Sequence, residues 1–285
     1  MKFPRDFFES FPQDPVDLSL LFCKKFELFS PGDIVGVGVS GGKDSMFLLN
    51  ILTFFRSRFG IKEVICLHFN HGTRGPESDR DEQFVRDTCN ELGIRFFCKR
   101  AQKELRSEDQ MRQERYSFFS DAADELSLTK IATAHNLDDL FETFLINIKR
   151  GGGFMSALGI YPVNMNLCNV PVVRPILPVK RKSILEYIKQ KNIGYVEDTS
   201  NIDIRITRNR LRMILSLLPE DLYNSILSGF FKFWLNLYSI SHFLIEIYEK
   251  KKEDLPPTIK KQIELYRETG EVKYENLKRS ILKKD

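Results

Sequence analysis

The sequence predicts an α/β protein with a doubly wound, mainly parallel sheet and a small helical C-terminal extension. Short apolar runs alternate with amphipathic segments through the first two hundred residues, and only the helical pattern continues after residue 219. Such alternation is typical of a parallel sheet that helices cover on both faces. The chain has 285 residues, 42% of them hydrophobic, which suits one domain with an appendage. We therefore expect a domain over residues 1–219 and a helical region over residues 220–285.

Each predicted strand is an apolar run, and a segment with apolar residues three or four apart follows it. Residues 33–39 and 63–69 are such runs, and helical segments at 43–59 and 77–92 come after them. The runs at 94–98 and 130–134 precede helical segments at 110–126 and 137–148, and a strand at 170–173 precedes a helix at 180–191. Ligands bind at the carboxyl ends of strands in such sheets, so we expect the chemistry just after residues 39, 69, 98 and 134.

Residues 226–248 form the most apolar stretch of the C-terminal region. Polar residues recur in it every three or four positions, with Lys232 among them. This spacing places the polar residues in one stripe along a helix. A membrane-spanning helix that faces lipid would not carry such a polar stripe. We expect an amphipathic helix whose broad apolar face packs against the rest of the chain or against a second copy, and no membrane partner.

The charge of the chain is unevenly distributed. The net charge is +4, and residues 201–285 carry 16 Lys and Arg against 12 Asp and Glu, while residues 1–200 hold equal numbers of both signs. A basic end on a neutral body favours a polyanionic partner for that end.

The five cysteines include no close pair, and the charged start does not resemble a signal peptide. We therefore expect a reducing, cytoplasmic location and no zinc or iron–sulfur site built on paired cysteines.

The first candidate motif directly follows the run at 33–39 and opens the next helix. Its residues are Ser40, Gly41, Gly42, Lys43, Asp44 and Ser45. Two glycines let backbone N–H groups point at an anion, which then lies on the positive end of the helix. A carboxylate such as that of Asp44 fits beside phosphates mainly when Mg²⁺ bridges them. The alternative is a simple Gly-Gly turn at a capped helix start.

Two further motifs follow later strands. His68 and His71 lie at the end of the second strand and could face a nucleotide, a substrate or, as an alternative, a metal ion. After the fourth strand come His135, Asp138, Asp139 and Glu142, and the three carboxylates fall on or near one helix face. Clustered carboxylates repel one another, which favours a general base or a cation site. The alternative is that acidic residues simply favour the first turn of a helix.

These motifs resemble a known family. The sextet at 40–45 resembles the pyrophosphate-binding loop of the N-type ATP pyrophosphatases, the PP-loop superfamily with an adenine nucleotide alpha hydrolase-like fold. The other motifs match the tRNA(Ile)-lysidine synthetases in the family's order: His68-x-Asn70-His71-Gly72-x-Arg74, Arg112-x-x-Arg115-Tyr116, His135-x-x-Asp138-Asp139-x-x-Glu142-Thr143, Arg150-Gly151-x-Gly153, Arg174-Pro175-Ile176-Leu177, Asp198-x-Ser200-Asn201 and Arg208-Asn209-Arg210-x-Arg212.

The resemblance implies a ligase that uses ATP and Mg²⁺. It would adenylate the 2-oxygen of the wobble cytidine of tRNA(Ile) with a CAU anticodon, and the amine of free lysine would then displace AMP to give lysidine. The ATP-binding residues that it implies are Ser40, Gly41, Gly42, Lys43, Asp44, Ser45, His68, His71, Arg112 and His135. The catalytic residues that it implies are Asp139, Glu142, Asp138 and Asp44, with Asp44 also at Mg²⁺.

The resemblance also implies a set of tRNA-binding residues: Arg150, Gly151, Gly153, Arg205, Arg208, Asn209 and Arg212. Together with Arg112 and Arg115, the arginines among them are expected at phosphates of ATP or RNA, and the alternative is a solvated face or ion pairs with acids such as Glu114 or Asp203. Because longer members carry further domains that grip the tRNA, recognition here is expected to be compact, weaker or shared within a homodimer. The alternative functions are a tRNA thiolase of the same superfamily and a non-catalytic RNA- or nucleotide-binding relative.

Overall fold

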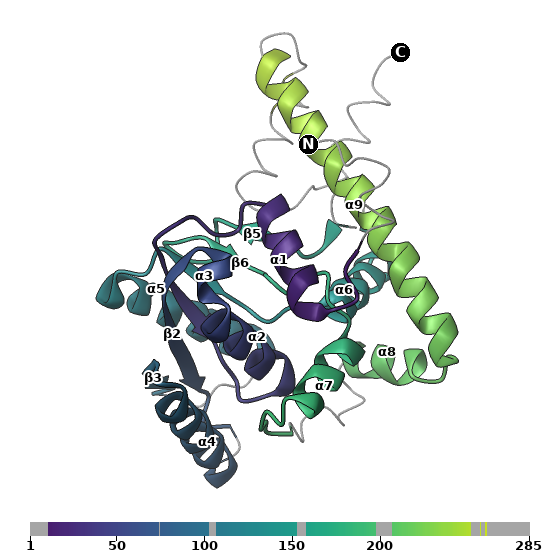
Figure 1. Ribbon diagram of the computed structural model, residues 1–285. Coiled ribbons are helices and arrows are strands. Elements are labelled where there is room, and N and C mark those ends of the chain that lie inside the picture. The colour runs from purple at the N-terminus through teal and green to yellow at the C-terminus, as the bar shows by residue number, and fades with distance from the viewer. Residues whose placement is uncertain are drawn as a thin grey trace, which may run out of the picture. The chain divides into compact units, whose positions relative to one another are not determined.

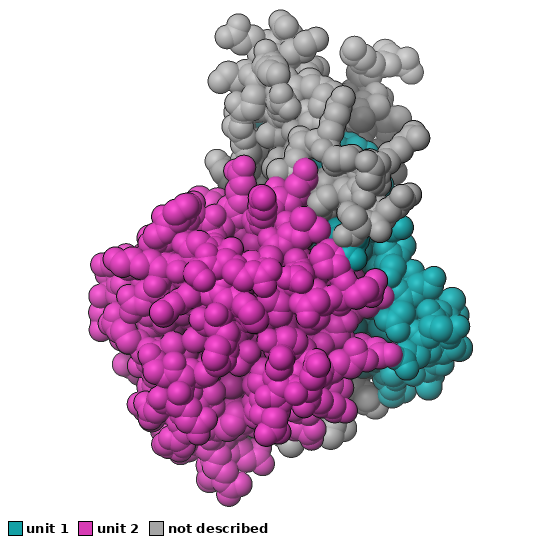
Figure 2. Space-filling model, viewed as in Figure 1, with its two compact units in different colours: residues 1–11, 138–160, 202–285 teal, residues 12–137, 161–201 magenta. Residues whose placement is uncertain are grey.

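A computed structural model describes residues 11–73, 75–102, 107–152, 158–197 and 207–251, together with residues 257 and 260. The chain forms two compact units, which Figure 2 distinguishes by colour. Unit 1 contains Met1–Phe11, Asp138–Ile160 and Ile202–Asp285, and unit 2 contains Pro12–Leu137 and Tyr161–Asn201. The predicted division at residue 219 into a catalytic domain and a helical C-terminal region stays a prediction.

Unit 2 contains a six-stranded sheet (Figure 1), which confirms the predicted fold class. Its strands are β1 (Asp33–Gly38), β2 (Ile61–Asn70), β3 (Arg95–Arg100), β4 (Lys130–Ala132), β5 (Val163–Asn164) and β6 (Val172–Val173). The order is β3-β2-β1-β4-β6-β5, and every pair is parallel except β5 with β6. The carboxyl ends of β1, β2, β3, β4 and β6 therefore lie at one edge of the sheet, where the motifs begin.

Helices cover both faces of this sheet. They are α1 (Pro15–Lys25), α2 (Lys43–Phe54), α3 (Arg56–Phe59), α4 (Pro76–Leu92), α5 (Glu108–Leu126) and α7 (Arg181–Gln190). Residues 65, 67 and 69 of β2 pack in a core with Phe118 and Phe119 of α5, and Asn70, on the other face of β2, contacts α4. A Cβ atom on Gly38 would lie 2.7 Å from the ring of Phe119, so this close approach of α5 requires glycine in β1.

The single helix predicted over residues 43–59 is wrong. Helix α2 ends at Phe54, and one further turn, α3, ends at Phe59, followed by the cap residue Gly60, whose φ of 78° is left-handed. The break turns the chain into β2 at Ile61 and buries Phe59 against the ring of Phe29, 6.0 Å away. Apolar spacing alone does not reveal it, because Phe55 and Phe59 continue the pattern of α2.

Unit 1 is helical where the structure describes it. Its helices are α6 (Leu137–Lys149, the first residue of which belongs to unit 2), α8 (Thr207–Leu215) and α9 (Glu220–Lys251). The ring of Phe230 lies 4.9 Å from those of Phe141 and Phe144, and buried Trp234 donates from Nε1 to the carbonyl of Leu158 at 2.8 Å. The apolar face of α9 thus packs against α6, as one of the two alternatives predicted. None of the helices in the described residues is long and apolar enough to cross a membrane.

Candidate active site

The turn between β1 and α2 is shaped to receive an anion. Gly41 has a φ of 88°, which L side chains rarely adopt. The Ser45 hydroxyl donates to the carbonyl of Gly42 at 2.8 Å and accepts from the N–H of Ser40 at 3.2 Å. The N-cap of α2 is Gly42, and no side chain caps the helix there within the described residues. The first N–H groups of α2 are thus available to a phosphate, and the turn fits the polyphosphate of ATP.

His68 supports this turn from the neighbouring strand. Its Nδ1 lies 2.9 Å from the carbonyl of Val39, the residue before the turn, and a carbonyl can only accept, so Nδ1 carries the proton. Burial lowers the pKa of His68, which keeps the ring neutral. Its Nε2 is then a buried acceptor that has no hydrogen-bond partner in the described part of the chain. Among the residues that the structure describes, no three or more His, Cys, Asp or Glu side chains are grouped so that they could hold a metal ion.

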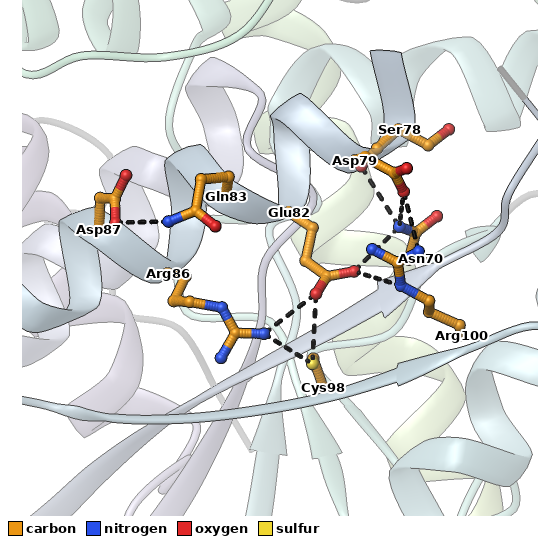
Figure 3. Close-up of polar contacts among 9 residues, drawn as sticks. All are labelled: Asn70, Ser78, Asp79, Glu82, Gln83, Arg86, Asp87, Cys98 and Arg100. Atoms are coloured by element: carbon orange, nitrogen blue, oxygen red, sulfur yellow. Dashed lines mark hydrogen bonds and ion pairs between the residues drawn. The ribbon is translucent and has the colours of Figure 1, made fainter. Parts of the chain in front are cut away.

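Buried Glu82 of α4 is the centre of a network of polar contacts (Figure 3). Its carboxylate accepts from Asn70 at 3.0 Å, from Arg86 at 3.0 Å and from the Nε of Arg100 at 2.9 Å. The Sγ of Cys98 lies 3.7 Å from the same carboxylate. The side-chain oxygen of Asn70 accepts from the N–H of Gly72 at 2.9 Å, so Glu82 fixes the turn that carries the second motif.

Burial by itself would raise the pKa of Glu82, but the hydrogen bonds from Asn70, Arg86 and Arg100 hold it below its ordinary value. Glu82 was not among the predicted site residues. A signal was present, since residues 78, 82, 85 and 89 lie on one helix face and three of them are small or apolar. An acid on the buried side of an amphipathic helix indicates a partner for its charge.

Replacing Glu82 with glutamine is expected to lower the free energy of unfolding by about 2 kcal/mol at neutral pH, because charge-assisted hydrogen bonds are lost. A lowered folded-state pKa stabilises above the unfolded pKa of 4.5 and loses that effect as the pH falls through the folded value. The difference between wild type and E82Q should therefore be full above pH 5 and shrink below it. Urea unfolding at several pH values measures this, with the exposed Asp87→Asn on the same helix as control. A pH-independent difference would contradict the role of the charge.

The three carboxylates near the start of α6 all have partners in unit 1. Tyr223 donates to Asp138 at 3.0 Å. Arg212 donates from Nε to Glu142 at 2.8 Å and from a terminal nitrogen to Asp139 at 3.1 Å. Glu142 is 1% exposed and Asp138 is 5% exposed. The structure therefore brings Asp138, Asp139 and Glu142 together on one helix and places a cation between two of them.

Arg208 belongs to the same cluster. Its Nε lies 3.7 Å from Glu142, and another of its nitrogens donates to the hydroxyl of Thr143 at 3.0 Å. Both α8 arginines that the resemblance assigns to phosphates thus face carboxylates in this structure, and their contacts with RNA stay predictions. Ion pairs were among the alternatives for these arginines, although with other acids. The carboxylates of this cluster can therefore bind a positively charged group where little water reaches it.

The comparisons with known proteins agree with these motifs. Residues 21–220 match the family model of the PP-loop domain. A tRNA(Ile)-lysidine synthase of Petrotoga mobilis is 33% identical over 250 residues, which cover 85% of this chain and 78% of that protein. The chain belongs to the tRNA(Ile)-lysidine synthase family. It is accordingly a PP-loop enzyme of the ligase class, as predicted.

Other lysidine synthases are longer than this chain. Those of Clostridium perfringens and Pseudothermotoga lettingae are 38% and 39% identical, and the matches cover 71% and 75% of this chain but only 44% and 49% of those proteins. Among solved structures, the U34-tRNA thiolase NcsA from Methanococcus maripaludis aligns with 80% of each chain at a TM-score of 0.60 and 17% identity. At that identity the likeness concerns the fold alone.

The structure also describes five other predicted residues of this lysidine synthase family member. His135 lies with Nδ1 3.1 Å from the Thr133 hydroxyl, and Asn209 is buried in α8. Arg150 is exposed after α6, and Gly151, with a φ of 75°, ends that helix. Arg112 lies over the ring of Tyr116. Gly153 and Arg205 lie outside the described residues.

Proposed function

We propose that this protein joins lysine to the 2-position of the wobble cytidine of tRNA(Ile) with a CAU anticodon, forming lysidine through an adenylated cytidine. The observation that carries the proposal is the guanidinium of Arg212 between Asp139 and Glu142. Two carboxylates that hold a cation on an ATP-binding scaffold suit a substrate with an amine that is positively charged in water. Family membership supports the same reaction.

In the first step the cytidine oxygen attacks the α-phosphorus of ATP, and pyrophosphate leaves. Backbone N–H groups at Gly41 and Gly42, the hydroxyls of Ser40 and Ser45 and the ammonium of Lys43 would bind the phosphates. Asp44, half-buried in the first turn of α2, would hold Mg²⁺, which neutralises phosphate charge when bound. His68, His71, Arg112 and His135 would complete the ATP site.

In the second step the amine of lysine attacks C2 of the cytidine, and AMP leaves with the oxygen that was adenylated. The amine must lose a proton to attack, and a carboxylate of the α6 cluster would accept it. Asp139 or Glu142 would be this base, and Asp138, held by Tyr223, would support the charge of the site. Arg212 would leave the carboxylates when the amine arrives.

Transfer RNA would contact residues after α6 and around α8, where the basic excess of the chain begins. Arginine side chains there would bind backbone phosphates, which makes affinity fall with salt. The residues proposed for this contact are Arg150, Gly151, Gly153, Arg205, Arg208, Asn209 and Arg212. A second copy of the chain would supply further contacts, and the reaction would take place in the cytoplasm.

The release of pyrophosphate from ATP tests this function against the alternatives. With tRNA(Ile) bearing a CAU anticodon, turnover is expected to require both the tRNA and lysine. A non-catalytic relative would release no pyrophosphate under any of these conditions. With a sulfide donor in place of lysine, a thiolase would turn over, and mass spectrometry of the tRNA nucleosides would then show a gain of sulfur. Either of these outcomes would overturn the proposed function.

A further inference from the structure

Three cysteines of unit 2 lie between its sheet and α4. Cys66 belongs to β2, Cys98 to β3 and Cys89 to α4, and all three are free thiols. Cys66 lies four positions before Asn70, which contacts α4, and Cys98 lies two positions before Arg100, which also contacts α4. Since side chains alternate along a strand, the two strand cysteines face the same helix. Cys66 and Cys89 are fully buried, with 0% exposure.

Cys66 and Cys89 contact each other. Their side chains are hydrogen-bonded, although one residue is in β2 and the other is near the end of α4. The part of the chain that the structure describes contains no group of three or more His, Cys, Asp or Glu that could hold a metal ion, so these thiols do not form a metal site. Two sulfur atoms in contact can instead bond to each other, at an S–S distance of about 2.05 Å.

The two thiols of this pair are not equivalent. The hydrogen bond from Cys66, and then the charge of Arg86, hold the pKa of Cys89 below its ordinary value, although burial alone would raise it. Burial raises the pKa of Cys66. Because the thiolate is the nucleophile in sulfur chemistry, Cys89 is the member that would attack an oxidant, and Cys66 is the thiol beside it.

The other three cysteines all have raised pKa values. Burial, and then Glu82, raise the pKa of Cys98, whose sulfur lies 3.5 Å from Arg86 and 3.7 Å from Glu82 (Figure 3). Burial also raises the pKa of Cys23, and it raises the pKa of Cys168 to about 11. A protonated thiol is a poor nucleophile, so these three residues are suited to packing, the usual role of a buried cysteine.

We infer that Cys66 and Cys89 form a reversible disulfide when the protein meets hydrogen peroxide. The Cys89 thiolate attacks one oxygen of the peroxide and breaks the O–O bond, which leaves Cys89 as a sulfenic acid and releases hydroxide. Cys66 then loses its proton, and its sulfur displaces the sulfenic hydroxyl, which leaves with that proton as water. Two thiols are oxidised and one peroxide is reduced, which gives one disulfide and, once the hydroxide takes up a proton, two molecules of water.

Burial limits which oxidants reach this pair. Hydrogen peroxide is uncharged and little larger than water, so local opening at the edge of the sheet, where β3 lies, can admit it. A small dithiol restores the reduced pair by exchange. The reaction is independent of the proposed function, because none of its steps uses ATP, lysine or RNA.

The disulfide would close a loop that contains the second predicted motif. His68, His71 and Glu82 all lie between the two cysteines in the chain. A covalent link across this loop restricts the unfolded chain, so the oxidised protein should unfold at a higher urea concentration than the reduced protein. Peroxide should produce no such difference in Cys66→Ser, which cannot form the link.

Peptide mapping of the full-length protein tests the pair. The reduced, folded protein is treated with one equivalent of hydrogen peroxide, unfolded in the presence of iodoacetamide, digested and analysed by mass spectrometry. We expect a linked peptide that contains Cys66 and Cys89. The other cysteines should carry the alkyl group: Cys23, Cys98 and Cys168. Treatment with dithiothreitol before alkylation should abolish the link.

Five variants assign the roles, and circular dichroism verifies that each is folded. In Cys66→Ser, Cys89 should stop at the sulfenic acid, which dimedone traps after unfolding. In Cys89→Ser, Cys66 should stay reduced, whereas Cys98→Ser should form the link as the wild type does. Arg86→Gln should slow the oxidation about three- to tenfold, because the thiolate loses a neighbouring positive charge. The control is Arg95→Gln, which removes an exposed arginine of β3 and should leave the rate unchanged.

Two results would overturn the inference. One is that no linked peptide forms in the folded protein, or that it forms only in urea, since the folded contact would then contribute nothing. The other is oxidation of Cys98 or Cys168 while Cys66 and Cys89 stay reduced, since exposure alone would then decide which thiol reacts.

Discussion

Replacing Asp139 with asparagine is expected to lower the rate of lysine transfer by about 10²- to 10⁴-fold, the usual contribution of a positioned general base. Asparagine keeps the size of the side chain and an oxygen that can accept from Arg212, which lies 3.1 Å away in the wild type. It cannot accept a proton from the amine or balance its charge. Single-turnover transfer of lysine to pre-adenylated tRNA measures this step separately from the use of ATP.

A matched variant makes this result specific. Asp221 is an exposed acid in the first turn of α9, in the same unit as Asp139, and Asp221→Asn removes one negative charge there. D221N should transfer lysine at the wild-type rate. If D139N stays within tenfold of wild type, the proton acceptor is a different group, and Glu142→Gln becomes the next variant to measure.

Replacing Trp234 with alanine should lower the free energy of unfolding of unit 1 by about 3–5 kcal/mol, as large-to-small changes in a core do. Trp234 is fully buried, stacks between Phe231 and Tyr238 at 6.0 and 5.3 Å, and donates to Leu158. Because α9 supports α6, which carries the carboxylates, the variant should also lose lysine transfer as it loses stability. Far-UV circular dichroism in urea measures the unfolding.

The neighbouring aromatic residue provides the control. Phe233 is 47% exposed and contacts only the edge of this packing, with its ring 6.1 Å from that of Phe144. Phe233→Ala should therefore cost about 1 kcal/mol or less and leave transfer unchanged. Equal losses in both variants would mean that the burial of Trp234 is not what stabilises α9.

Most of the fold could be predicted because strands and helices leave periodic patterns. The runs at 33–39 and 63–69 are β1 and β2 with ends shifted by one or two residues, and the parallel order places the motifs at one edge. The break at Phe55 could not be predicted, because the apolar spacing continues through it and a tertiary contact decides it. The apolar face of α9 was predictable, but the choice of α6 as its partner required the structure.

The candidate site was predictable as a set of residues but not as a set of contacts. Gly41 and Asp139 are visible in the sequence because their types and spacing match an anion turn and an acidic helix start. The ion pairs of Arg212 with Asp139 and Glu142 join residues 73 and 70 positions apart, and no local pattern encodes such a distance. Whether Arg208 and Arg212 bind RNA or the carboxylates depends on how α8 packs against α6.

The incorporation of labelled lysine into tRNA tests the proposed function most directly. The purified protein is incubated with ATP, Mg²⁺ and labelled lysine, together with tRNA(Ile) bearing either a CAU anticodon or a GAU anticodon, whose wobble base is not cytidine. We predict label only in the CAU tRNA, at a level that D139N reduces at least a hundredfold. If the CAU tRNA stays unlabelled while a lysidine synthase such as that of Petrotoga mobilis labels it, the proposed function is wrong.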